Sequence, residues 1–262
     1  YHIQPFYPNE IANAIKKQSL NVAKRISPLL DKNLQIKLIL VTERNRDFIG
    51  KELARLIPND DWLRDTEPFL KDYGTLAGFY SRSGTGGGTA FYLKDRGYGY
   101  YFGHTSSLAT LKTYWPQVAP HEMSHVLQSV LAEGLDPANQ QHSEGSPLAR
   151  WQGHLIEGSA NTLGMAWGFE KVGWYSDEMD YLLQNDIKRH KRKITMNTES
   201  DAIKFMQTIK SRNNEFGGFA YSAGQIIWEF YIGKYGAPKL IELFRNLPQT
   251  DHYSANLKKT IG

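Results

Sequence analysis

The sequence lacks cysteine altogether, which excludes disulfides, thiolate metal ligands and cysteine nucleophiles. It also lacks any apolar run near the ~18 residues that a membrane-spanning helix needs, so no transmembrane segment is expected. Charge of one sign is not in large excess, because the net charge is only +4 at pH 7. With 40% hydrophobic and 22% charged residues, the composition indicates a folded globular chain and excludes a disordered one.

The chain begins at Tyr1 and not at Met, which indicates a processed form or a piece of a longer protein. Together with the absence of cysteine, this favours an extracytoplasmic or secreted location. One basic run, KRHKRK at residues 188–193, could bind nucleic acid or an anionic surface. The favoured interpretation is a solvated basic end of the preceding helix, and no nucleic-acid partner is expected.

Local patterns predict an α+β fold in two parts. Residues 34–42 are rich in branched apolar residues, as in a strand, and residues 77–105 contain short aromatic segments separated by glycines, as in antiparallel strands. From about residue 117 the periodicity is helical. We therefore expect a small mixed sheet and a first subdomain at residues 1–135, followed by a mainly α-helical subdomain at residues 136–262.

The segment HEMSH, residues 121–125, carries the strongest chemical signal. His121 and His125 lie one helical turn apart and can both face one ion, and neutral imidazole suits Zn²⁺. Glu122 lies one residue round the helix, where it can hold a water molecule and act as general base. The alternative interpretation is a pair of histidines facing solvent on an amphipathic helix.

A catalytic zinc ion takes three protein ligands, so a third is required. Positions 128 and 131 hold Gln and Leu, which excludes a third histidine in the compact spacing. The remaining candidates are Asp136, His142, Glu144, His154 and Glu157. We favour Glu157 over Glu144, because Glu157 lies in an apolar helix where a metal ion would neutralise it, although an interhelical salt bridge is the alternative.

Two further polar residues lie one turn on either side of Glu157. Asn161 could accept the ring N–H of a ligand histidine and fix its tautomer, or could be a surface amide. His154 could be an auxiliary ligand or an outer-shell residue, and a histidine at the rim of the site is the favoured interpretation.

HEMSH followed by LIEGSA, with Trp151 shortly before Glu157, resembles the gluzincin metallopeptidases, in particular the aminopeptidase N branch and its peptidase MA-like relatives. The resemblance implies a zincin-like fold, one catalytic Zn²⁺ on His121, His125 and Glu157, and Glu122 as base. The helix beginning AYSAG is similar to that branch's Tyr-x-x-Gly helix, which implies that Tyr221 stabilises the oxyanion. A phenol O–H is a suitable donor for that role.

These observations predict a zinc-dependent metallopeptidase that acts on a peptide or protein substrate. The G-x-M-E-N motif with which the aminopeptidases hold a free amino terminus is absent, so an endopeptidase is favoured. The strand expected at residues 87–93 could bind extended substrate by main-chain pairing, or could be internal to the sheet. The rival function is a catalytically inactive zinc-binding or protein-interaction module on the same fold.

Overall fold

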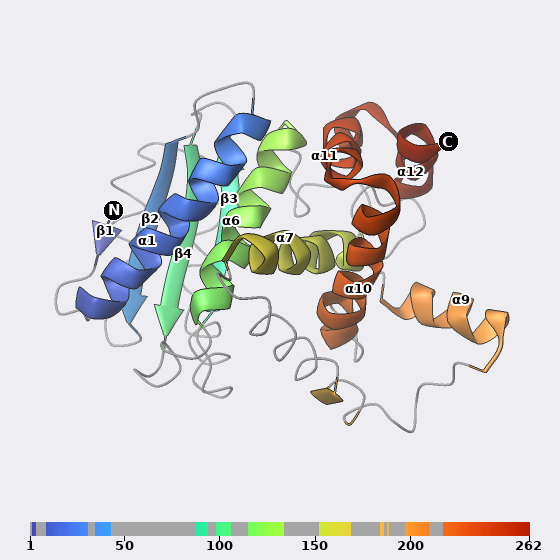
Figure 1. The fold of residues 1–262 in the computed structure, drawn as a ribbon, viewed down its shortest axis with the longest axis horizontal. Helices are drawn as coiled ribbons and strands as arrows, with labels where there is room; N and C mark the ends of the chain where they lie inside the picture. The colour runs from blue at the N-terminus through green and yellow to red at the C-terminus, as the bar shows by residue number, and fades with distance from the viewer. Residues whose placement is uncertain are drawn as a thin grey trace, which may run out of the picture.

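The computed structural model describes residues 2–3, 9–30, 35–42, 87–93, 98–105, 115–133, 152–168, 184–185, 188, 197–209 and 217–262 (Figure 1). Its N-terminal helix is α1 (Asn9–Ile26), followed by the short 3-10 turn η1 (Ser27–Leu29). The central helices are α6 (Trp115–Leu131), the π-helical turn η4 (His154–Gly158) and α7 (Ser159–Gly168). The C-terminal elements are α9 (Glu199–Thr208), α10 (Gly217–Tyr235), α11 (Ala237–Asn246), the 3-10 turn η5 (Leu247–Gln249) and α12 (Tyr253–Ile261).

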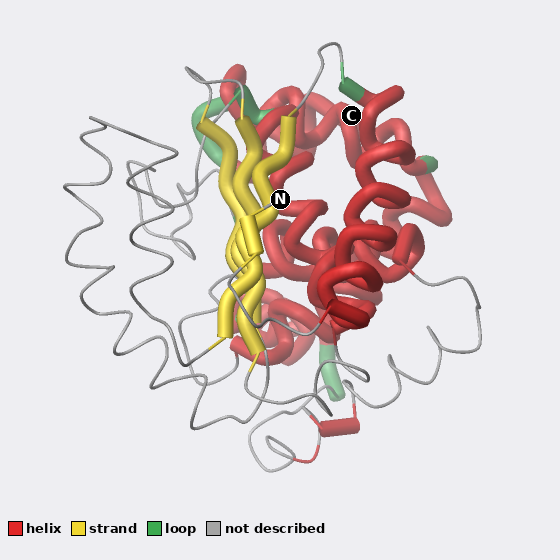
Figure 2. The backbone as a smooth tube through the Cα atoms, turned by 90° about the vertical axis from the view of Figure 1, so that its left-hand side faces the viewer, coloured by secondary structure: helices red, strands yellow, loops and turns green. Residues whose placement is uncertain are grey.

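Four strands pair through their backbones in the order β1-β2-β4-β3. They are β1 (His2–Ile3), β2 (Gln35–Thr42), β4 (Tyr98–Thr105) and β3 (Gly87–Leu93). β1, β2 and β4 run parallel, and β3 pairs antiparallel with β4 at one end of this order. The described helices lie to one side of the strands (Figure 2).

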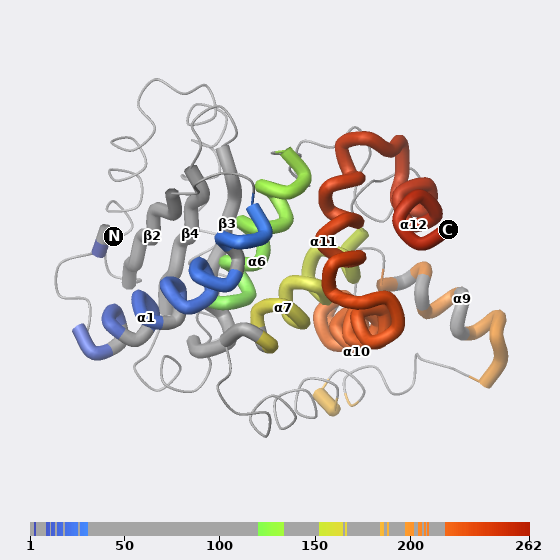
Figure 3. Tube along the Cα trace, turned by 45° about the horizontal axis from the view of Figure 1, so that its top comes forward, coloured from blue at the N-terminus to red at the C-terminus, as the bar shows by residue number. Residues whose placement is uncertain are grey.

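The hydrophobic core is formed between helices from both ends of the chain. Val22 of α1 packs in one cluster with Leu127 of α6, Trp228 of α10 and Phe244 of α11, all fully buried or nearly so. Figure 3 shows why: α6 and α7 run between α1 on one side and α10 and α11 on the other. The interior between these helices therefore positions whatever α6, η4 and α7 carry.

The predicted fold class is wrong. The part of the chain described with its side chains is 88% helical and forms no sheet, so it does not show the expected α+β fold with a mixed sheet. The physical reason lies in the core, where helices from both ends of the chain pack against one another in one buried cluster. The further segment of the expected sheet at residues 77–86 lies outside the described residues.

None of the helices that the structure describes combines the length and the apolar character needed to cross a membrane. Most of the basic run at residues 188–193 lies outside the described residues, and Lys188 is exposed.

Candidate metal centre

Helix α6 holds His121 and His125 on the face that meets η4 and α7. The opposite positions, Met123, Val126 and Leu127, are buried and fix how the helix sits in the core. Because the two histidines are four residues apart, their rings project from successive turns, and their centroids lie 4.6 Å apart at an interplanar angle of 88°. The packing of α6 therefore presents both rings to the same point.

Glu157 is carried by the π-helical turn η4, a rare conformation that recurs at functional sites. Two backbone carbonyls of this turn accept hydrogen bonds from side chains of neighbouring helices. The indole Nε1 of Trp228 donates to the carbonyl of His154 at 2.7 Å, and Nε2 of Gln128 donates to the carbonyl of Ile156 at 2.9 Å. Donors from α10 and α6 thus stabilise the turn from two sides.

Glycines let these helices approach until their backbones touch. A Cβ placed on Gly158 would lie 2.4 Å from the carbonyl carbon of Gly224, and one on Gly164 would lie 2.6 Å from the backbone nitrogen of His121. No other residue fits such contacts without moving a backbone. The glycine after Glu157 and the glycine three residues after Tyr221 therefore bring η4 and α10 together.

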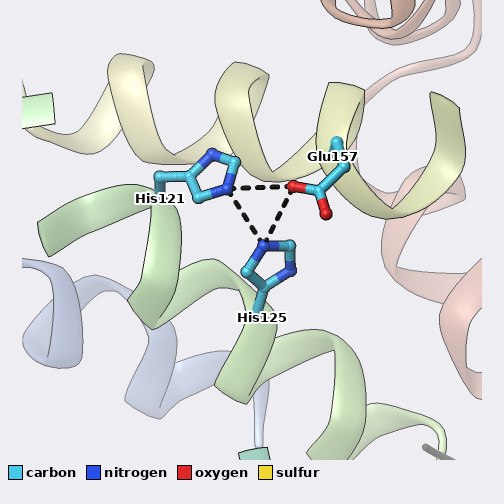
Figure 4. A group of neighbouring side chains, drawn as sticks. All are labelled: His121, His125 and Glu157. Atoms are coloured by element: carbon cyan, nitrogen blue, oxygen red, sulfur yellow. Dashed lines mark hydrogen bonds and ion pairs between the residues drawn. The ribbon is translucent and has the colours of Figure 1, made fainter. Parts of the chain in front are cut away.

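His121, His125 and Glu157 form the site cluster (Figure 4). Nε2 of His121 lies 3.0 Å from Nε2 of His125, and Oε2 of Glu157 lies 3.2 and 3.4 Å from these two nitrogens. Three ligand atoms on a tetrahedral zinc ion, with bonds of about 2.0–2.1 Å, would be about 3.3–3.4 Å apart. The triangle therefore has nearly the dimensions of three corners of a zinc tetrahedron.

Hydrogen bonds at Nδ1, the ring nitrogen that points away from the cluster, determine which tautomer each histidine adopts. Nδ1 of His121 contacts Oδ1 of Asn161 at 2.6 Å, and Nδ1 of His125 contacts Oε1 of Gln128 at 2.9 Å. An amide oxygen only accepts, so each Nδ1 carries a proton, and once Nε2 is deprotonated, as metal binding requires, its lone pair faces Glu157. Two lone pairs and a carboxylate oxygen then converge, and the donor set fits a divalent cation such as Zn²⁺.

Electrostatics within the cluster favour an ionised carboxylate. Burial by itself would raise the pKa of Glu157, which is only 2% exposed. The charge of His125 and the hydrogen bonds from His121 and His125 outweigh burial and hold the pKa of Glu157 well below its ordinary value. Glu157 is therefore available as an anionic ligand across the whole neutral pH range.

The structure brings several sequence candidates to this centre. Of the two interpretations of Asn161, the hydrogen bond to a histidine of the cluster is the one that the structure shows, since Asn161 contacts His121 and is buried. The ring of Tyr221 stacks on His121 with centroids 6.0 Å apart and an interplanar angle of 21°. Glu122 is 7% exposed and follows His121 directly on α6.

Other candidates lie elsewhere. His154 is 2% exposed, stacks on Trp228 and contacts the hydroxyl of Tyr253 at 3.2 Å, so the prediction of a histidine at the rim is wrong. Packing of α10 and α12 over η4 explains its burial. Asp136, His142, Glu144 and Trp151 lie outside the described residues.

Several residues that support the cluster were not predicted from the sequence. Gln128 was considered only as a position without histidine, yet its side chain contacts both His125 and the turn that carries Glu157. Its position three residues after His125 was the available signal, because i and i+3 side chains meet on a helix. The π-helical geometry of η4 has no comparable signature in the sequence.

Comparison with known protein families, with curated proteins and with solved structures finds no match for this chain.

Proposed function

We propose that this protein is a zinc-dependent metallopeptidase in which His121, His125 and Glu157 hold one catalytic ion. The observation that carries the proposal is the convergence of three electron-pair donors, with 3.0–3.4 Å between them: two from α6, the helix that also bears Glu122, and one from η4. The resemblance of HEMSH and LIEGSA to the gluzincin peptidases supports the same assignment.

A zinc ion in this position would act as a Lewis acid toward a water molecule and a substrate carbonyl. Glu122 accepts a proton from the water, whose oxygen attacks the carbonyl carbon of the peptide bond. Glu122 then delivers that proton to the leaving nitrogen as the carbon–nitrogen bond breaks. The products are one chain with a new carboxyl group and one with a new amine, so Glu122 ends the cycle ionised.

Tyr221 would donate its phenolic hydrogen to the oxygen that becomes negative during the attack. Its stacking on His121 supports this role, because the ring is fixed beside a ligand of the ion. The backbone contact of Gly224 with Gly158 supports it further, since the contact fixes the helix of Tyr221 against the turn of Glu157.

Strand β3 is the proposed site for extended substrate. It lies at one end of the order of the four described strands and packs against α6, so a peptide paired with it would run beside the helix of the histidines. Endopeptidase activity is favoured over aminopeptidase activity, because the motif for binding a free amino terminus is absent from the sequence.

The test measures bound metal and the hydrolysis of a peptide library, with and without chelator, for the wild-type protein and for Glu122→Gln. We expect one zinc ion per chain, chelator-sensitive cleavage, and a loss of about 10²- to 10⁴-fold in kcat for Glu122→Gln with zinc retained. Glu199→Gln on α9, an exposed residue away from the centre, serves as the matched control and should cleave as the wild type does.

The outcomes separate the rival functions. Zinc binding without cleavage by the wild-type protein would favour the inactive zinc-binding module. A folded protein that binds no zinc would overturn the proposal.

A further inference from the structure

We infer that Gln128 is a positioning residue that ties the second histidine of the centre to the turn carrying the third ligand. The inference rests on the zinc site proposed above and concerns how its geometry is maintained. A single amide contacts both parts of the donor set, although Gln128 itself is not a ligand.

The contacts of Gln128 point in two directions. Its Oε1 accepts from Nδ1 of His125 at 2.9 Å, within helix α6. Its Nε2 donates to the carbonyl of Ile156 and to Oγ of Ser159, both at 2.9 Å, across the interface with η4 and α7. These acceptors lie immediately before and two residues after Glu157, so the amide holds the backbone on both sides of that ligand.

Only an amide of this length satisfies these contacts together. The His125 ring needs an acceptor, and the two oxygens across the interface need a group with two hydrogens. A carboxylate only accepts, an ammonium only donates, and a thioether does neither effectively. Gln128 is 2% exposed, so water cannot easily substitute for a lost contact.

The π-helical turn makes this contact important. Such turns are uncommon, and the orientation of Glu157 depends on keeping this one in place. Ser159 itself donates to the carbonyl of Leu155, so the hydroxyl that receives Gln128 is bonded within the same turn. Gln128 therefore attaches α6 to a connected set of polar groups in the turn and its first residue.

Asn161 provides a comparison within the centre. It accepts from Nδ1 of His121 at 2.6 Å and belongs to α7, the helix that continues η4. Each histidine is thus joined to the helix of Glu157 through an amide, directly by Asn161 and through the Gln128 bridge. Without Gln128, His125 would keep its place on α6 but lose its coupling to the carboxylate.

The test compares Gln128→Met and Gln128→Glu with the wild-type full chain. Zn²⁺ affinity is measured by chelator competition, the geometry by the visible absorption of bound Co²⁺, and folding by the melting temperature without metal. We expect Gln128→Met to lose about 10- to 100-fold in Zn²⁺ affinity and to change the Co²⁺ spectrum. Gln225→Met is the matched control: it removes another fully buried glutamine, on α10, and should leave both readouts unchanged.

Gln128→Glu separates a bridge from a simple contact with His125, and it also carries the test if the methionine variant does not fold. The carboxylate still accepts from His125, but its second oxygen faces the carbonyl of Ile156 and repels the turn. We expect Zn²⁺ affinity below that of the wild type. If contact with His125 alone mattered, this variant would bind Zn²⁺ at least as tightly as the wild type, and that result would overturn the inference.

The two proposals fail in different ways. Unchanged Zn²⁺ affinity and Co²⁺ spectrum in Gln128→Met overturn the positioning role even if the melting temperature falls. A wild-type protein that binds neither ion overturns the zinc-dependent function and this inference with it.

Discussion

Two buried polar clusters in this protein differ in how their groups are matched. The C-terminal polar cluster consists of Asn246, Thr250, Asn256 and Thr260, and its side-chain donors are paired with acceptors. Asn256 Nδ2 donates to the carbonyl of Leu243 at 2.9 Å, and Asn246 Nδ2 donates to Thr260 Oγ1 at 3.1 Å. In the site cluster, when both histidine rings are neutral, three acceptors face one another. A cluster whose donors and acceptors are paired stabilises the fold, whereas acceptors that converge require a proton or a cation between them.

The largest expected effect comes from making the site cluster resemble the C-terminal one. Glu157→Gln replaces an anionic oxygen by an amide that can donate to Nε2 of a neutral histidine. We expect Zn²⁺ affinity to fall by more than about 100-fold, beyond the loss typical of outer-shell changes, because a ligand charge is removed. Chelator competition measures this effect. The free energy of unfolding in chelator should change little, and a variant that bound Zn²⁺ normally would contradict the assigned ligand set.

The next effect contrasts two hydroxyl groups. Tyr221→Phe keeps the ring on His121 and should lower kcat by about 10²- to 10³-fold, with Zn²⁺ affinity and melting temperature unchanged. Steady-state peptide hydrolysis measures kcat. Thr260→Val removes a hydroxyl from the C-terminal polar cluster, and it should lower the free energy of unfolding without changing kcat. Equal kcat values for wild type and Tyr221→Phe would remove Tyr221 from the reaction.

A third effect concerns the backbone contact beneath the site cluster. Gly158→Ala places a Cβ 2.4 Å from a backbone carbon of Gly224, so a helix must move. We expect a loss of about 3 kcal/mol in the free energy of unfolding, at the upper end for overpacking, together with weaker Zn²⁺ binding. Urea denaturation measures the first quantity.

Gly233→Ala is the control for that variant, because nothing lies within 4 Å of its added Cβ on the same helix as Gly224. Here the stability should rise, by about 0.5–1 kcal/mol, since alanine is the better helix former. Similar losses for the two variants would mean that the close approach of η4 and α10 has no special role.

The smallest effect concerns the matched cluster itself. Asn256→Ala leaves the carbonyl of Leu243 without this donor and should cost about 1–3 kcal/mol in the free energy of unfolding. Zn²⁺ affinity should stay within the error of the measurement, because α12 contributes no atom to the donor set. A marked loss of Zn²⁺ affinity would show that the two clusters are coupled.

The three residues of the site cluster were easier to predict from the sequence than the fold class. The i, i+4 spacing fixes His121 and His125 on one face, and the argument that a charge in an apolar helix needs a partner selects Glu157. Both features are properties of a single helix and can be predicted without knowing what the helix packs against. The fold class depends on which helices share a core, and α1, α6, α10 and α11 are too far apart in sequence for local periodicity to show it.

The residues that support the cluster could not be predicted from the sequence, for a related reason. Gly158 and Gly224 lie 66 positions apart, and their contact becomes meaningful only when both helices are placed. His154 lies only three residues before Glu157 in the same turn, yet its ring packs against Trp228 and Tyr253 and not against the histidines of α6. Which face of η4 meets α6 follows from its π-helical winding, and residue types alone do not predict that winding.

The π-helical winding of η4 also determines the directions in which the residues before and after it point. A π-helical turn contains one residue more than the α-helical turn that it replaces, so the residues before and after it differ by about 100° from the positions they would occupy in a regular helix. Deleting a single residue between Gln152 and Glu157 would favour regular winding and either rotate Glu157 away from both histidines or move Gly158 out of its contact with Gly224. The geometry of the site cluster thus depends on the length of this segment as well as on its composition, and a chain that keeps His121, His125 and Glu157 but loses one residue here would lose the cluster.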